Sequence, residues 1–89
     1  MITQNLINKT AQRVYDIINH IENYLDENKL TLPLNEYELL LKIRDDNRYF
    51  LIFLESVTRE KKIERLSFEN DLSPIITNCK LIERLFNLD

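Results

Sequence analysis

The chain has 89 residues, a net charge of −3 and 44% hydrophobic residues, with one cysteine, one histidine and no glycine or tryptophan. A chain this short builds one core, so we expect a single helical domain over residues 1–89. The missing glycine excludes phosphate-binding loops of the P-loop, dinucleotide and kinase types, because their backbones approach the ligand at glycine. The single cysteine excludes an intrachain disulfide and cysteine-based zinc sites, and it fits a reducing compartment.

The sequence gives no sign of membrane insertion. No stretch approaches the roughly 18 continuous apolar residues of a membrane-spanning helix. Met1 to Lys9 also lack the apolar core of a signal peptide. We therefore expect a cytoplasmic protein with no membrane partner.

Residues 4–28 are predicted to form one long helix. Six apolar residues recur there at alternating spacings of four and three, which is the seam of helices that pack side by side. They are Ile7, Ala11, Val14, Ile18, Ile21 and Leu25. At 1.5 Å per residue this helix is about 37 Å long, so it sets the longest dimension of the molecule.

A second helix is predicted after the connector Leu30–Leu34, which Pro33 keeps non-helical. Asn35 is expected to be the N-cap, with Glu38 as its capping-box partner. The end of this helix is left open. Heptad spacing continues through Asp45–Asn47, but a tight turn at these residues would divide the segment into two helices.

The segment Tyr49–Leu54 consists of six consecutive apolar or aromatic residues. We expect it to be helical, because Glu55–Leu66 continues as a run of strong helix formers without glycine or proline. A short buried strand is the alternative. A helix that is apolar all round must be enclosed on nearly every side. Either this segment is the central helix of a bundle, or part of it meets another chain.

A last helix is predicted after a loop or single turn at Ser67–Leu72. Ser73 is expected to be its N-cap and Pro74 its first helical residue, which is a favoured combination. The expected fold is therefore all-α, a small antiparallel bundle of three to four helices with a long N-terminal helix.

Catalytic chemistry is not indicated by any residue cluster. Asp16 and His20 lie four positions apart on the polar side of the first helix, but two ligands are too few to hold a metal. Cys79 falls on the apolar stripe of the last helix, where a buried structural thiol is the common case, so we do not expect a nucleophile paired with His20. We predict no catalytic residue, no metal and no cofactor, and we expect the protein not to be an enzyme.

The sequence instead favours a binding protein. We expect a small helical module that docks on a protein target by steric means, and inhibitors from phage or mobile elements, immunity proteins and adaptor subunits share its size and build. Tyrosine is favoured at interface cores. The candidate partner-binding residues are Tyr15, Tyr24, Tyr37, Arg59, Lys61, Lys62 and Arg65. A homodimer is left open as well.

Two alternative functions are kept. The basic segment Arg59–Arg65 would serve a nucleic-acid-binding regulator, because cations along a helix can follow phosphates. Interleaved glutamates and the net negative charge argue instead for a solvated helix face, so we do not expect nucleic acid as the partner. A small dimeric all-helical enzyme would need a polar pocket that holds at least two convergent charged groups.

Overall fold

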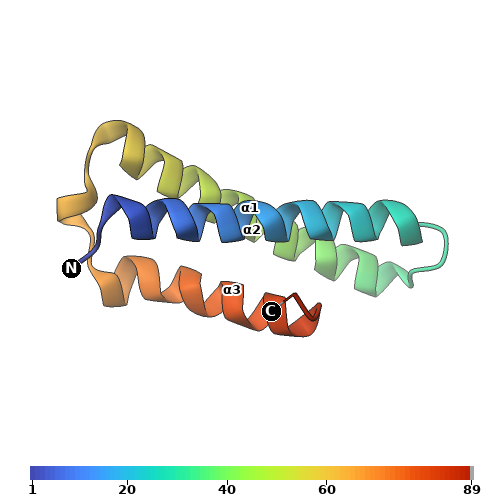
Figure 1. Ribbon diagram of the computed structural model, residues 1–89. Coiled ribbons are helices and arrows are strands. Elements are labelled where there is room, and N and C mark those ends of the chain that lie inside the picture. The colour runs from blue at the N-terminus through green and yellow to red at the C-terminus, as the bar shows by residue number, and fades with distance from the viewer. Residues whose placement is uncertain (89) are drawn as a thin grey trace.

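The computed structural model describes residues 1–88 and is all-helical over that range, with no strand (Figure 1). Three helices and two short helical turns follow one another: α1 (Gln4–Asn28), α2 (Leu34–Glu60), the 3₁₀ turn η1 (Ile63–Arg65), the π turn η2 (Phe68–Leu72) and α3 (Ser73–Leu85). The prediction of an all-α fold with a long N-terminal helix is confirmed, and residues 1–88 form three helices.

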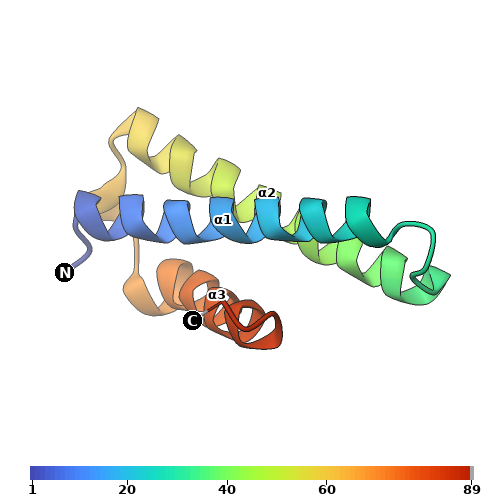
Figure 2. The same ribbon diagram turned by 45° about the vertical axis from the view of Figure 1, so that its right-hand side comes forward.

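α1 lies between the other two helices (Figures 1 and 2). It packs antiparallel along α2, and α3 runs beside the amino-terminal part of α1. α3 ends short of the turn that joins α1 to α2, so the tip of the α1–α2 hairpin protrudes beyond it. The molecule is elongated, with extents of 46 × 23 × 18 Å.

The core is built on α1. The predicted seam is confirmed, because five of its six members are buried and Ala11 is half-buried. Ile17 widens the buried stripe toward α3. The helix starts with a side-chain cap, since the Thr3 hydroxyl accepts a hydrogen bond from the Leu6 N–H at 3.1 Å. The other helical segments complete the core with Leu40, Leu54, Leu72, Ile75, Cys79 and Ile82.

α2 begins two residues earlier than we expected, and without a capping box. Leu34 is its first residue, so Asn35 and Glu38 lie inside the first turns, where both are exposed. The carbonyl of Pro33 accepts a hydrogen bond from the Tyr37 N–H at 3.0 Å. The N-cap prediction for Asn35 is wrong, because the backbone of the preceding proline already takes the N-cap position.

α2 then continues unbroken through Asp45–Asn47, which decides the question of one helix or two. Asn47 is fully buried in the core. Its amide nitrogen donates to the Ile43 carbonyl at 2.8 Å, and its side-chain oxygen accepts from the amide of Asn78 on α3 at 2.9 Å. Asn47 therefore joins α3 to α2 by a hydrogen bond, and it does not form the tight turn that was the alternative.

α2 ends at a residue with left-handed backbone. Lys61 has φ 55°, and its N–H bonds back to the Thr58 carbonyl at 3.3 Å. The Lys62 N–H bonds to the Val57 carbonyl at 3.0 Å. This pair of reverse bonds is the Schellman arrangement, which normally has glycine where this chain has Lys61.

The start of α3 also differs from the prediction. Ser67 caps the preceding turn η2, because its hydroxyl accepts from the Asn70 N–H at 3.2 Å while its own N–H donates to the Asp71 carboxylate at 2.7 Å. η2 leads directly into α3, so Ser73 is already a helical residue and Leu72 precedes it with helical backbone. The N-cap prediction for Ser73 is therefore wrong, whereas the single turn at Ser67–Leu72 is confirmed.

Candidate protein-interaction surface

The apolar segment Tyr49–Leu54 is helical but not enclosed. Leu54 is fully buried, whereas Tyr49 is 76% exposed and Ile52 is 65% exposed. The alternative in which this segment is the central helix of the bundle is wrong, because α1 takes the central position and leaves one side of α2 facing solvent. The alternative that part of the segment meets another chain is the one still available.

Tyr15 of α1 extends this exposed surface across the helix pair. Its side chain is half exposed and lines a shallow hollow of about 270 Å³ together with Leu51 of α2. Glu55 also lines this hollow and lies three residues after Ile52, on the same side of α2, so the hollow borders the exposed part of the apolar segment. Tyr15, Tyr49, Leu51 and Ile52 are together named the α2 patch below.

The three candidate tyrosines do not share one surface. Tyr15 and Tyr24 are nine residues apart on α1, which places them on opposite sides of the helix. The Tyr24 ring packs on the α3 side, with its centroid 5.8 Å from that of Phe86. Tyr37 is half-buried near the hairpin tip, beside Leu25. Of the three, Tyr15 is the one that belongs to the α2 patch.

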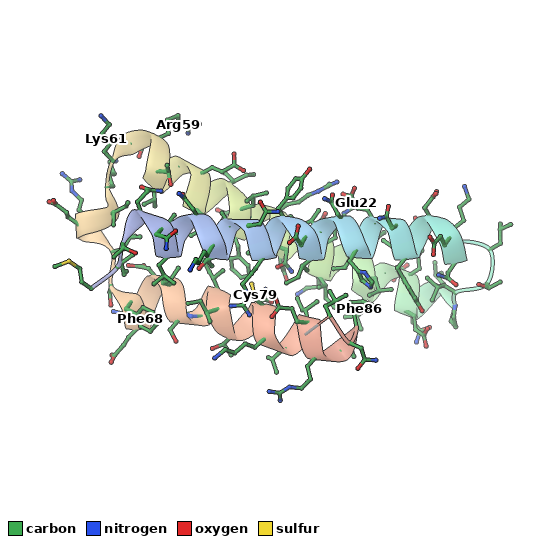
Figure 3. The ribbon with its side chains drawn as sticks, viewed as in Figure 1. Glu22, Arg59, Lys61, Phe68, Cys79 and Phe86 are labelled. Atoms are coloured by element: carbon green, nitrogen blue, oxygen red, sulfur yellow. The ribbon has the colours of Figure 1, made fainter. Side chains whose placement is uncertain are left out.

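The four basic candidates lie around the end of α2 and not along one helix face. Arg59 is in the last turn of α2, Lys61 has the left-handed backbone, and Arg65 ends η1. All four side chains are exposed, and Lys62 pairs with Glu60 at 3.0 Å. Figure 3 shows Arg59 and Lys61 at the end of the molecule where α2 stops. The turn of the chain separates these cations, so they form no continuous stripe.

A second apolar surface opens where α3 stops. A groove of about 520 Å³ lies between the ends of the helices, and its main apolar lining residues are Tyr24, Leu39, Leu40, Leu85 and Phe86. Leu39 and Leu85 are both mostly exposed. His20 and Glu36 also line the groove, and the His20 ring lies 4.9 Å from the ring of Phe86. This surface is named the α3-end groove.

The α3-end groove was not predicted, although the sequence contains a signal for it. Leu81 and Leu85 lie four residues apart and form a second apolar stripe on α3 beside the core stripe of Cys79 and Ile82, and Leu88 follows just beyond the helix end. One short helix with two apolar stripes indicates more apolar surface than one core contact covers.

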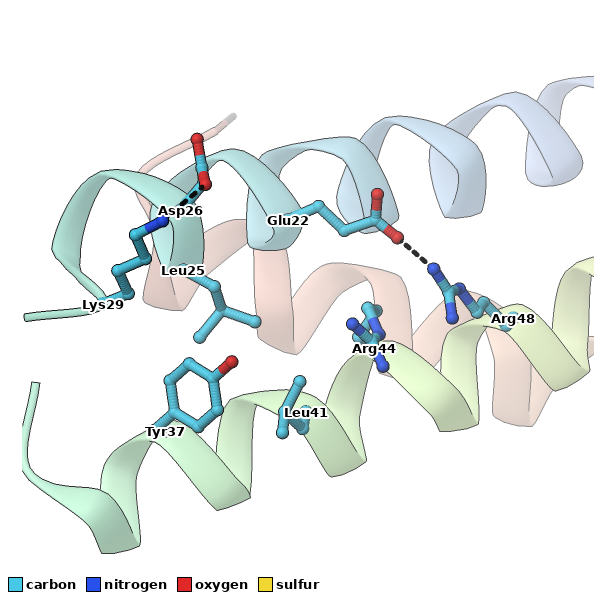
Figure 4. Close-up of a pocket in the computed structure, with 8 residues that line it drawn as sticks. All are labelled: Glu22, Leu25, Asp26, Lys29, Tyr37, Leu41, Arg44 and Arg48. Carbon is cyan, nitrogen blue, oxygen red and sulfur yellow. Dashed lines mark hydrogen bonds and ion pairs between the residues drawn. The ribbon is translucent and has the colours of Figure 1, made fainter.

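A third hollow, of about 290 Å³, lies along the α1–α2 seam near the hairpin tip and is polar (Figure 4). Arg48 of α2 pairs there with Glu22 of α1. Arg44 pairs with its neighbour Asp45 at 3.0 Å. Because both arginines already have carboxylate partners, their charge is compensated within the chain and the hollow does not present a basic site.

The candidate chemical groups are not assembled into a reactive site. Cys79 is fully buried (Figure 3), and burial raises the pKa of its thiol to about 11, so the thiol stays protonated at neutral pH. His20 packs on Phe86, and Asp16 accepts a hydrogen bond from Gln12 at 2.8 Å. Within residues 1–88 no three histidine, cysteine or acidic side chains group as they would around a metal ion.

No helix in the described part of the chain has the length and apolar character needed to cross a membrane. Comparison of the chain with protein-family models, with curated proteins and with solved structures gives no match.

Proposed function

We propose that the chain is a small antiparallel helical bundle that acts as a protein-binding module and docks on a protein target through the α2 patch. The exposure of Tyr49 and Ile52, in the most apolar segment of the chain, carries this proposal. Covering apolar surface contributes about 25 cal/mol per Å², and an aromatic side chain buries on the order of 150–250 Å². A partner that covers the α2 patch therefore gains several kcal/mol before the costs of association.

The surroundings of the α2 patch have the composition of a transient interface. Asp45 lies four residues before Tyr49, and Glu55 lies three residues after Ile52, so both carboxylates border the apolar centre on the same side of α2. Asp45 is itself paired with Arg44. An apolar centre with a polar, solvated rim is typical of partners that also exist apart.

The proposed mechanism is steric. α2 is one unbroken helix of 27 residues whose opposite side is fixed to the core through Leu54 and Asn47, so the patch is presented without rearrangement. A target bound at the α2 patch has its own binding surface blocked by the chain. Alternatively, the chain links this target to a second molecule that binds elsewhere on the chain. A preformed surface avoids the entropic cost of ordering a segment on binding.

Affinity capture from a lysate of the organism that encodes the chain tests the proposal. The baits are the tagged full chain, the double variant Tyr49→Ala/Ile52→Ala, and the control Leu30→Ala, which truncates an exposed leucine in the α1–α2 connector. The wild type and the control are expected to retain the same polypeptide, and the double variant to lose it by at least about tenfold. Because all three positions are exposed, circular dichroism should be unchanged.

Equal capture by the wild type and the double variant contradicts the proposal, as does a wild-type bait that retains no protein. A nuclease-sensitive capture that weakens steeply with salt, and that Lys61→Glu/Lys62→Glu abolishes, would replace it with the nucleic-acid alternative.

A further inference from the structure

α3 carries an apolar stripe that the fold leaves uncovered. Leu81 and Leu85 are exposed and lie four residues apart on one side of α3, and the exposed Leu88 follows just beyond the end of the helix. The core residues Cys79 and Ile82 occupy a different side of the same helix. The stripe therefore has the pattern of a helix face that packs against a further helix.

Cations border this stripe, and the α3-end groove has the opposite charge. Lys80 and Arg84 are exposed, and neither pairs with a carboxylate within residues 1–88. Glu36 lines the groove beside Leu39 and likewise has no ion pair in that range. A basic-flanked apolar stripe and an acidic-edged apolar groove thus occur on the same chain, with Leu85 part of both.

The chain exposes more surface than a compact monomer of its mass would. A 10.8 kDa monomer is expected to expose about 5,500 Å², whereas this chain exposes 6413 Å². The excess of about 900 Å² reflects the elongated shape, 46 × 23 × 18 Å, which leaves apolar side chains such as Leu39 and Leu85 in solvent. Each partner in a standard interface covers about 800 Å². The radius of gyration, 14.2 Å, also exceeds the value of about 12 Å expected for a compact domain of this length.

We propose that two copies of the chain form a symmetric dimer in which the α3 stripe of each copy packs into the α3-end groove of the other. Leu85 lies at the twofold axis because it belongs to both surfaces. Arg84 of one copy then approaches Glu36 of the second copy, and the same contact repeats in reverse. Such a reciprocal contact closes at two copies. It leaves the α2 patch uncovered, so the dimer does not depend on the proposed function.

Sedimentation equilibrium on the full chain, from low to high micromolar concentration, tests the dimer. Leu85→Arg places a charge at the axis and is expected to raise the dissociation constant of the dimer by at least about tenfold. Ile52→Arg is the matched control, because Ile52 is on α2 and is exposed to the same extent, 65%. It should leave the dissociation constant unchanged, and circular dichroism should show both variants folded.

Charge reversal tests the placement of the two copies. Arg84→Glu and Glu36→Lys are each expected to weaken the dimer, because both contacts in each homodimer then pair like charges. Mixing the two single variants should restore the dimer, since in the mixed pair every contact again joins opposite charges. If a substitution weakened the dimer only by disturbing its own chain, mixing the two variants would not restore the dimer.

A wild-type chain that stays monomeric over the whole concentration range overturns the proposal. It is also overturned if Ile52→Arg dissociates the dimer and Leu85→Arg does not, or if the mixed charge variants remain monomers.

Discussion

Lys61 and Asn87 show how a chain without glycine ends its helices. Their φ angles are 55° and 57°, in the left-handed region where a side chain crowds the backbone. After Asn87 the Leu88 N–H bonds back to the Glu83 carbonyl at 2.7 Å, so α3 ends with the same reverse bonds as α2. Asparagine tolerates this conformation better than lysine does. The strain is therefore greatest at Lys61.

Replacing Lys61 by glycine should stabilise the protein. Glycine removes the steric cost of the left-handed backbone but adds freedom to the unfolded chain, so the expected net gain is about 0.5–1 kcal/mol. Urea unfolding followed by circular dichroism measures this gain. Lys62→Gly is the control. Lys62 has φ −103°, so its backbone has no left-handed steric cost for glycine to remove. If the two variants change stability equally, the effect is not due to the backbone conformation of Lys61.

At the scale of elements, one buried hydrogen bond joins α2 to α3. Asn78 donates its amide to the side chain of Asn47, and Asn47 is completely shielded from water. A second tie joins α3 to α1, where Arg13 contacts Glu83 through two nitrogens. The hydrogen bond to Arg13 lowers the pKa of Glu83, so this tie persists through mildly acidic pH.

Asn78→Ala is expected to destabilise the chain by about 1–3 kcal/mol, because it leaves the buried oxygen of Asn47 without a donor. Thr77→Ala, at the exposed neighbouring position, is the control and should change the free energy of unfolding by less than about 0.5 kcal/mol. Both are measured by urea unfolding. A loss no larger for Asn78→Ala than for the control would mean that water replaces the missing donor.

The long elements could be predicted from the sequence because their periodicity is local, as the α1 seam shows. The starts of α2 and α3 could not, since Asn35 and Ser73 look like caps in isolation but lie inside helices that begin after Pro33 and directly after η2. The exposure of Tyr49 could not be predicted either. The exposure of Tyr49 depends on which helix lies at the centre of the fold. The sequence pattern of α2 alone does not indicate that α1 occupies the centre.

At the scale of the whole molecule, α3 covers only part of the α1–α2 hairpin, so protection should be uneven. Amides of residues 26–40, near the uncovered tip, are expected to exchange with solvent faster than those of residues 14–21, which lie in the core. Native-state hydrogen exchange on the Leu85→Arg variant measures this without any contribution from a second copy. Uniform protection along α1 would show that the hairpin is held as firmly at its tip as at its centre.

The order of the helices along the chain has a consequence for folding. α1 and α2 are consecutive and pack as a hairpin, so their contacts form between nearby segments and are made quickly. α3 is synthesised after α1 and α2, and until it is made the hairpin exposes the site that α3 fills, including the side chain of Asn47. An α3 from a neighbouring chain fits that site equally well, which is the route to domain swapping. The short segment between Glu60 and Ser73 favours the chain's own α3, because it keeps that helix close to its hairpin from the moment both exist.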